Sequence, residues 1–277
     1  MPRPPRTSRW KLSNRGPEIS RALRERGRQW PAPIRWLETV GSTNDFLKER
    51  SREGAAGWAV VVASRQTAAR GRQGRAWLSP SGNLFLSLLL RPTLPAESAG
   101  LVPLAAGVAA AEAAAEWGVA VQLKWPNDLV VRGRKLGGVL VEASAGAEGL
   151  ETVVVGVGMN LALDPADAPP ALRGALTSVR AETGGEPGVP AAAAAVLDRL
   201  AVWYDALARD GPPLVLAAWR ARSVPWWGRA VEARSGDAVL RGVARDLDPR
   251  GALILDLADG SRRAVFSGEV REVRLES

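Results

Sequence analysis

The chain contains neither cysteine nor histidine among its 277 residues. Because no disulfide can form, the fold must be held together by a hydrophobic core. Apolar residues make up 46% of the sequence, which is enough for a sizeable core in one large domain or in a domain with a small partner. Zinc sites built on Cys or His are excluded, as are Cys–His and Ser–His–Asp nucleophiles. Any chemistry must therefore use carboxylates, lysine, arginine, hydroxyls or backbone amides.

The charge balance is strongly basic, with a net charge of +8 and a pI near 10.9. Such a balance suggests nucleic acid, an anionic surface or phosphate-bearing ligands as partners. Only Lys11, Lys48, Lys124 and Lys135 are lysines, and all other basic residues are arginines. Arginine, glycine, alanine and proline are abundant together, as a GC-rich coding sequence would give. We favour a dispersed excess of arginine over a dedicated nucleic-acid surface.

Residues 1–33 are expected to form an N-terminal arm with one short helix over 19–28. The first residues are basic and proline-rich, without the apolar region of a secretory signal. No stretch reaches the roughly 18 apolar residues of a membrane span, and the alanine-rich run over 102–115 is expected to be a buried helix. Together with the lack of cysteine, these features predict a cytoplasmic protein without membrane contact.

The compact part of the chain divides into two expected domains, 34–222 and 223–277. Hydrophobic periodicity in the first predicts both strands and helices, and therefore an α+β fold with a mixed sheet. After residue 223 short strands alternate with turns at 235–237, 248–251 and 259–260, which is typical of a small β-barrel. The expected strands are 34–38, 58–64, 83–91, 119–124, 129–132, 137–143 and 151–157; the expected helices are 44–53, 97–117, 191–210 and 213–222, with loop over 165–190.

A glycine- and arginine-rich loop, QTAARGRQGR, runs from Gln66 to Arg75 directly after an expected strand. Glycine lets the backbone approach a ligand closely, and the arginine fork suits phosphate or carboxylate oxygens. A solvated surface loop or an RNA-binding tract has the same composition. The position after a strand, with Trp77 close behind, favours a lid over a ligand.

The string KWPND at 124–128 combines a restrained turn with polar side chains. Pro126 restrains the turn, and Trp125 offers a flat face for a purine or for core packing. Asn127 and Asp128 can cap a turn or hold a cation such as Mg²⁺.

The string RKLGG at 134–138 retains a lysine in a chain that otherwise uses arginine. The ammonium group of Lys135 is a compact point charge that can follow an oxygen during transfer. The alternative is a hairpin lysine without a role.

Two shorter motifs supply polar side chains beside glycines. In GVGMN at 156–160, a dinucleotide site is disfavoured because the third glycine is missing and prolines follow where a helix should run. Close approach of the backbone to a ligand, with Asn160 as a polar contact, fits better. In GSTN at 41–44, the hydroxyl and amide groups at a helix start can cap the helix, bind a polar ligand, or do both.

Taken in order, STN, Q-x-x-x-R-G-R-x-G-R, KWPND, RKLGG and G-x-G-x-N resemble the biotin–protein ligase family. The resemblance covers roughly residues 34–275, including SGEV at 267–270. It implies a mixed α+β catalytic domain of the class II synthetase and biotin ligase type, followed by an SH3-like barrel. It also implies two half-reactions: biotin and MgATP give biotinyl-5′-AMP and pyrophosphate, and a lysine of a biotin carboxyl carrier protein then attacks the mixed anhydride.

The resemblance also implies roles for residues at matching positions. Arg70, Arg72 and Lys135 would be catalytic, with the loop ordering over the adenylate. The biotin pocket would be lined by Ser42, Thr43, Asn44, Gln66, Arg70, Gly71, Arg72, Lys135, Gly137 and Gly138. The ATP side would use Trp77, Lys124, Asn127, Asp128 and Asn160, with Asp128 as the candidate Mg²⁺ ligand. Ala69 departs from the family's usual glycine, which would cost about 1 kcal/mol if the position required a positive φ.

Other functions remain open at this stage. Some members of the family repress transcription through an N-terminal winged-helix domain, but about 33 residues precede the core here, so we expect no specific DNA binding. A lipoate ligase shares the catalytic architecture, although KWPND and the C-terminal barrel favour biotin. A basic nucleic-acid-binding protein is the non-enzyme alternative and predicts affinity that falls steeply with salt. We expect a monomer or a weak homodimer.

Overall fold

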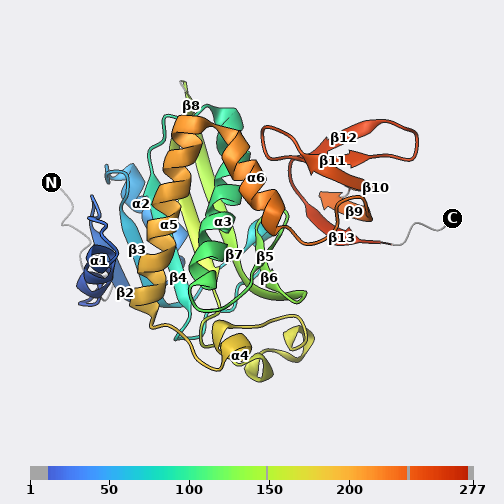
Figure 1. Ribbon diagram of the computed structural model, residues 1–277. Coiled ribbons are helices and arrows are strands. Elements are labelled where there is room, and N and C mark those ends of the chain that lie inside the picture. The colour runs from blue at the N-terminus through green and yellow to red at the C-terminus, as the bar shows by residue number, and fades with distance from the viewer. Residues whose placement is uncertain (1–11, 148, 236–237, 274–277) are drawn as a thin grey trace.

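The computed structural model describes residues 12–147, 149–235 and 238–273, which form an α/β unit and a smaller all-β unit beside it (Figure 1). The α/β unit contains an eight-stranded sheet in the order β1-β2-β3-β4-β8-β7-β6-β5. β2 and β3 run parallel, and the other neighbouring strands are antiparallel. The strands are β1 Leu12–Ser13, β2 Ile34–Val40, β3 Val60–Gln66, β4 Leu84–Leu90, β5 Gln122–Lys124, β6 Asp128–Val131, β7 Arg134–Gly146 and β8 Gly149–Met159.

Helices cover both faces of this sheet because its central strands are apolar on both sides. In β3, Val60 and Val62 join the core under α3 and α5, whereas Val61 and Ala63 join the core under α2. This alternation is the period of two expected for a strand buried on both faces. The helices are α1 Gly16–Glu25, α2 Thr43–Arg52, α3 Leu101–Ala115, α4 Val179–Thr183, α5 Val189–Asp210 and α6 Pro212–Arg222.

The alanine-rich helix α3 lies beside α5 on one face of the sheet, and both helices contact its strands (Figure 1). The stretch Ala96–Ala115 is long and apolar enough to cross a membrane, but 67% of its apolar window is buried inside the molecule, as in a core helix. The expected helix over 97–117 begins as a 3₁₀ turn, Ala96–Gly100. At Gly100 a Cβ atom would lie 2.4 Å from the carbonyl oxygen of Arg250, so this turn is packed directly against the all-β unit.

The part of the expected N-terminal arm that the structure describes is built into the α/β unit. β1 pairs with β2 at the edge of the sheet, and α1 buries Ile19 and Leu23 completely. The helix begins earlier than the expected 19–28 because Pro17 suits its first turn. It ends at Glu25, before Gly27 with a φ of 76°.

The all-β unit is a five-stranded antiparallel sheet in the order β12-β11-β10-β9-β13. Its strands are β9 Ala230–Ser235, β10 Ala238–Leu247, β11 Leu253–Asp256, β12 Arg262–Val265 and β13 Glu269–Glu272. Val231, Leu253 and Leu255 are fully buried in its core. This five-stranded sheet fits the expected small SH3-like domain, and the expected boundary near residue 223 stays a proposal. The segment expected to be loop over 165–190 also contains α4, which sequence patterns missed because it has a single turn.

Candidate functional site

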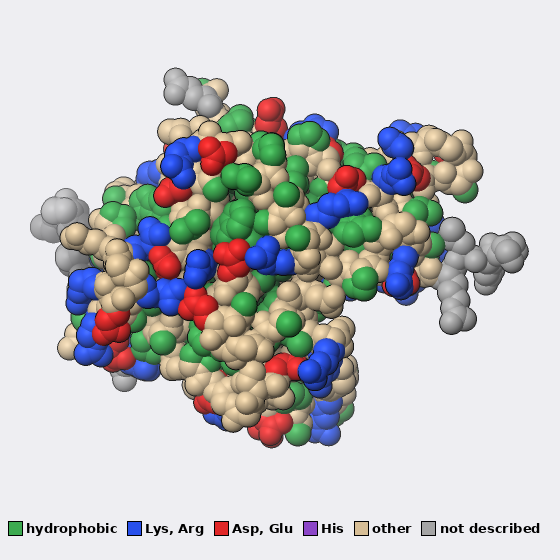
Figure 2. Space-filling model, in the orientation of Figure 1, with side chains coloured by type: hydrophobic (Ala, Val, Ile, Leu, Met, Phe, Trp, Pro, Cys, Tyr) green, Lys and Arg blue, Asp and Glu red, His purple; other side chains and the backbone are tan. Residues whose placement is uncertain are grey.

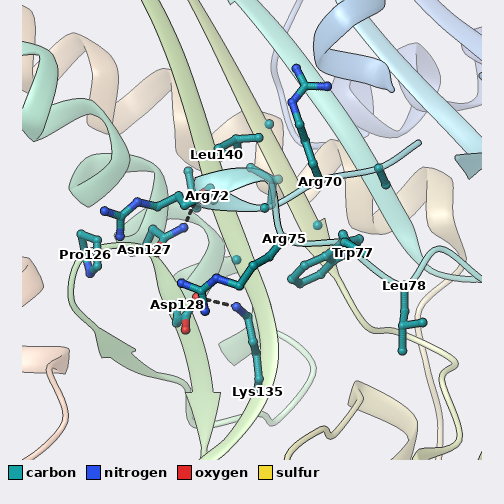
Figure 3. Close-up of a pocket in the computed structure, with 18 of the residues that line it drawn as sticks. Arg70, Arg72, Arg75, Trp77, Leu78, Pro126, Asn127, Asp128, Lys135 and Leu140 are labelled. Carbon is teal, nitrogen blue, oxygen red and sulfur yellow. Dashed lines mark hydrogen bonds and ion pairs between the residues drawn. The ribbon is translucent and has the colours of Figure 1, made fainter. Parts of the chain in front are cut away.

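A cavity of about 630 Å³ opens on the face of the sheet that carries α2, within the size range of small-molecule sites. Its walls come from the start of α2, the Gln66–Trp77 loop, the β6–β7 hairpin and the all-β unit (Figure 3). The residues predicted from sequence that line it are Ser42, Thr43, Asn44, Gln66, Arg70, Gly71, Arg72, Trp77, Lys124, Asn127, Asp128, Lys135, Gly138 and Asn160.

The floor of the cavity is a patch of sheet with few side chains. Phe85, Gly158, Gly138 and Asp128 are successive cross-strand partners in one row over β4, β8, β7 and β6. Cross-strand partners project from the same face of a sheet, so the two glycines leave a stretch without side chains of its own between an aromatic ring and a carboxylate. A second row joins Ser87, Gly156 and Leu140.

At Gly156 and Gly158 glycine is required because neighbouring side chains occupy the space of a Cβ atom. A Cβ at Gly156 would lie 2.4 Å from Asn44 Oδ1, and one at Gly158 would lie 2.9 Å from the Trp77 indole. Gly137 is different: it does not line the cavity, and its Cβ would lie 2.6 Å from Gly158 O. Gly137 is thus the predicted pocket residue that the structure does not bring to this cavity, since it packs behind the floor.

Hydrogen-bonding side chains gather at the α2 end of the cavity. Ser42 caps α2 by accepting a hydrogen bond from the Asp45 amide. The Thr43 amide donates to Gln66 Oε1 at 2.8 Å, and Asn44 Nδ2 donates to Glu142 Oε2 at 2.9 Å. Ser87, which no sequence motif singles out, is completely buried and donates to Asn44 Oδ1 at 2.6 Å. These contacts fix a small polar group of side chains in one arrangement.

Arg70 belongs to an ion-pair network at this end of the cavity. Its guanidinium contacts both Asp45 oxygens, at 2.5 and 2.6 Å, and Glu142 Oε1 at 3.1 Å. Lys48 also pairs with Glu142, at 2.7 Å, and with Asp45, at 3.0 Å. The hydrogen bond from Arg70 lowers the pKa of Asp45 to about 2, and the same contact raises the pKa of Arg70. Burial alone would raise the pKa of Glu142, but hydrogen bonds from Lys48, Asn44 and Arg70 lower it.

The rest of the arginine loop reaches toward the all-β unit. Arg72 Nη1 donates to Gly268 O at 3.1 Å, and Arg75 forms an ion pair with Glu269. Burial lowers the pKa of Arg72. Gln73 and Gly74 carry the positive φ values of the turn, 56° and 72°, whereas Ala69 is not among the residues with positive φ in the described chain. The alanine that replaces the family's usual glycine therefore causes no backbone strain here.

Lys135 points into the cavity because β7 carries a bulge. Gly137 pairs with Leu129, but Lys135 pairs with Val130, so Leu136 is an extra residue in β7. Such a bulge changes which face the preceding side chains take. Leu136 packs in the core on the helix side, and Lys135 Nζ lies 2.6 Å from Asp128 Oδ1 and 5.2 Å from the centroid of the Trp77 ring (Figure 3).

Several polar groups of the predicted ATP side are engaged within the protein. Asn127 Nδ2 donates to Val139 O at 2.6 Å, and buried Asn160 donates to Thr177 O at 2.9 Å. Trp125 is buried, and its Nε1 donates to Gly251 O of the all-β unit at 3.0 Å. Trp77 Nε1 is buried without a hydrogen-bond partner among the described residues, and the indole packs over Gly158.

Besides Glu269 of the SGEV segment, the all-β unit contributes three charged residues to the cavity that sequence reasoning missed. Glu232, Arg234 and Arg271 line it from β9 and β13. Glu232 is completely buried beneath Arg234, Arg241 and Arg271, whose hydrogen bonds lower its pKa to about 2. No local motif surrounds these residues, and only the packing of the two units brings them to the site.

Comparisons with known proteins agree with this geometry. Residues 36–160 match the Biotin/lipoate A/B protein ligase family, and residues 227–271 match the Biotin protein ligase C terminal domain. A biotin--[acetyl-CoA-carboxylase] ligase of Paracoccus denitrificans is 37% identical over 78% of this chain and 91% of its own length. One of Mycobacterium tuberculosis is 34% identical over 94% of this chain and 97% of its own length.

A solved structure shows the same fold. The biotin protein ligase of Aquifex aeolicus in complex with biotin and ATP superposes with a TM-score of 0.75 at 28% identity, over 87% of this chain and 99% of that one. The cavity with its glycine floor, the arginine loop and the C-terminal barrel therefore occur here in a chain that belongs to the biotin–protein ligase family.

Proposed function

We propose that this protein activates biotin with ATP, forming biotinyl-5′-AMP and pyrophosphate, and then transfers biotin to a lysine of a carrier protein. The observation that carries the proposal is the convergence of Arg70, Arg72 and Lys135 on one cavity with a glycine floor. This chain aligns with nearly the whole length of relatives that are named as biotin ligases, which supports the same activity.

The cluster of polar side chains at the α2 end of the cavity suits the ring of biotin. Biotin carries a ureido group that both donates and accepts hydrogen bonds, and Thr43, Asn44 and Gln66 offer matching amide and hydroxyl groups. Its apolar chain would run along the cavity beside the Asn44 and Trp77 side chains, which cover Gly156 and Gly158. Its carboxylate would then point toward the part of the cavity that holds Lys135.

The first half-reaction needs charge and positioning rather than a covalent nucleophile. A biotin carboxylate oxygen attacks the α-phosphorus of ATP; the new O–P bond forms as the bond to the pyrophosphate oxygen breaks. Lys135 and Arg72 would stabilise the negative charge that develops on the phosphate oxygens. Arg70, held by Asp45 and Glu142, would orient the Gln66–Trp77 loop above the reacting phosphate.

We propose that Mg²⁺ enters with ATP as part of the substrate. Among the described residues no group of three acidic side chains could hold a metal by itself. Mg²⁺ commonly binds through one or two carboxylates together with substrate phosphates. Asp128 lines the cavity and uses Oδ1 to bind Lys135, which leaves its second oxygen as the candidate contact.

In the second half-reaction a carrier lysine attacks the acyl carbon of the anhydride; the C–N bond forms and AMP leaves. The names of the relatives indicate a carboxylase as acceptor, so we propose a biotin carboxyl carrier protein as partner. The loop contacts of Arg72 and Arg75 with the all-β unit would open to admit that lysine. The cytoplasmic location and the monomeric or weakly dimeric state stay predictions.

The alternative functions are less well supported. The match of residues 227–271 to a C-terminal domain of biotin protein ligases favours biotin over lipoate. A nucleic-acid surface would need a face of one charge, but Figure 2 shows blue and red side chains interleaved on the face in view. Many surface arginines are also paired with carboxylates.

The proposal is tested by biotin-dependent release of pyrophosphate from MgATP. We expect release by the wild-type protein, loss of release in Lys135→Ala with the melting temperature retained, and normal release in Arg65→Ala, which removes an exposed charge outside the cavity. We expect this loss because Lys135→Ala removes the positive charge that lies beside Asp128 and is proposed to stabilise the phosphate oxygens. Normal release by Lys135→Ala would refute the role of this lysine, and no release by the wild type would refute the activity.

A further inference from the structure

A segment outside the sequence motifs holds the backbone of Lys135. The Lys135 amide donates to Ala175 O at 2.7 Å, and the Thr177 amide donates to Lys135 O at 2.9 Å. The two contacts form a parallel bridge between Lys135 and Leu176, and Leu176 itself lines the cavity. The segment 175–177 thus acts as a short extra strand beside the bulged part of β7.

This segment is tied down by a buried carboxylate on α4. Thr177 is completely buried, and its Oγ1 donates to Glu182 Oε1 at 2.5 Å. The same carboxylate accepts a hydrogen bond from Arg134 Nη2 at 2.8 Å, and its side chain is only 5% exposed. Glu182 therefore links segment 175–177 to the residue that directly precedes Lys135.

Burying the Glu182 carboxylate has a free-energy cost. A contact that serves stability alone could be made without that cost. A buried carboxylate loses hydration, and only good hydrogen bonds compensate for that loss. The two close bonds clamp the bulge from both sides, with Thr177 on the added strand and Arg134 on β7. A β-bulge interrupts the ladder and leaves the local backbone less constrained, so a clamp at this place fixes the direction of Lys135.

We propose that Glu182 is a positioning residue that sets the direction of the Lys135 ammonium group for adenylate formation. It acts through Thr177 and Arg134 and touches no substrate. The inference rests on the proposed function, because it assumes that Lys135 serves the first half-reaction. Small misplacements of a reacting group reduce rates by about 100-fold, so loss of the clamp should be visible in kcat.

The test measures pyrophosphate release and melting temperature for Glu182→Ala, Glu182→Gln and Glu186→Ala. Glu186 is the matched control because it lies nearby in the chain and pairs with Arg180 at the surface, outside the cavity. We expect Glu182→Ala to lower kcat about 10- to 100-fold with little change in the KM for biotin, whose proposed ring site lies at the α2 end. Glu182→Gln retains an oxygen acceptor for Thr177 and Arg134 and should recover most of the activity. Glu186→Ala should match the wild type.

A double-mutant cycle with Lys135→Ala separates positioning from mere stability. If Glu182 acts through Lys135, Glu182→Ala should have little further effect on the residual rate once Lys135 is absent. Equal losses in both backgrounds, or a wild-type kcat in Glu182→Ala, would overturn the inference. Thr177→Val removes one contact of the clamp and gives the same test if Glu182→Ala does not fold. An inactive wild type would instead refute the proposed function.

Discussion

Gly156 shows how a single missing side chain shapes this site. A Cβ atom there would lie 2.4 Å from Asn44 Oδ1, and Asn44 is held by Ser87 and Glu142. Gly156→Ala must therefore displace Asn44 and break at least one buried hydrogen bond, each worth about 1–3 kcal/mol when a buried partner is left unsatisfied. We expect the KM for biotin to rise about 10-fold or more.

Gly146→Ala is the control for this substitution. It lies on β7 outside the cavity, and its Cβ would meet only ordinary contacts with Glu151 at 3.5 Å or more. It should leave the KM for biotin unchanged. A wild-type KM in Gly156→Ala would show that Asn44 does not contact biotin.

The pKa of Asp45 predicts a pH dependence of stability. Pairing with Arg70 lowers this pKa from 3.8 to about 2, so the folded state favours the ionised carboxylate. The stabilisation is complete above pH 3.8 and is lost as the pH falls toward 2. Since Asp45 is partly exposed, we expect a contribution of about 1 kcal/mol or less.

Melting temperatures of the wild type and of Asp45→Asn between pH 7 and pH 3 test this expectation. The wild type should be the more stable protein near neutral pH, and the difference should shrink at the acid end. A difference that stays constant over this range would contradict the ion pair with Arg70.

For individual residues, the sequence motifs identified most of those that line the cavity. They missed the residues that only tertiary packing brings to the site. STN, the arginine loop and KWPND were predictable because each is contiguous and carries its own chemistry. Gly137 lies outside the cavity lining, and its motif does not reveal the bulge that turns Lys135, and not Leu136, toward the cavity. Ser87 was missed because a lone serine in an apolar strand gives no signal.

Among the elements, the arginine loop has the clearest functional consequence. Arg72 lies between the cavity and Gly268 O, where it would retain the anionic adenylate and exclude water. We expect Arg72→Gly to release biotinyl-AMP into solution and to biotinylate bystander proteins, because the activated intermediate then reacts with exposed lysines.

Gln73→Gly is the matched loop control. Gln73 has a φ of 56°, which glycine adopts readily, and its side chain is exposed and does not line the cavity. It should remain selective for the carrier. Mass spectrometry of a protein mixture incubated with each variant gives the measurement, and full selectivity of Arg72→Gly would count against a lid role.

The elements themselves were largely predictable, since the expected strands and long helices recur with shifted ends. The β6–β7 turn is the informative difference. Arg132 and Gly133 both have positive φ, 49° and 77°, so they form a two-residue hairpin turn and β7 starts at Arg134. Lys135 therefore lies inside a strand rather than in the expected loop, and sequence alone does not indicate that segment 175–177 pairs with it.

In the whole molecule, the all-β unit completes the cavity. It supplies Arg234 and Arg271 to the lining, and Gly251 O accepts the hydrogen bond of Trp125. Residues more than 100 positions apart in the chain thus meet at one site. Sequence patterns predicted the barrel but not its docking, because docking depends on close backbone contacts such as that at Gly100.

Gly100→Ala tests this docking. Its Cβ would lie 2.4 Å from Arg250 O, so the all-β unit must shift. Overpacking of this kind costs about 1–3 kcal/mol, and we expect a lower melting temperature together with a higher KM for ATP. Gly185→Ala, with open space around its Cβ, should change neither quantity. An unchanged KM for ATP in a destabilised Gly100→Ala would show that the all-β unit does not contribute to ATP binding.

Transfer of biotin to a carrier protein tests the proposed activity of this protein directly. Purified protein is incubated with labelled biotin, MgATP and a biotin-carboxyl-carrier domain, and the carrier is mapped by mass spectrometry. We predict that one carrier lysine gains biotin, that this gain requires ATP, and that Lys135→Ala reduces it to a small residual rate. A carrier that stays unmodified with the folded wild-type protein, or modification that proceeds without ATP, would contradict the account.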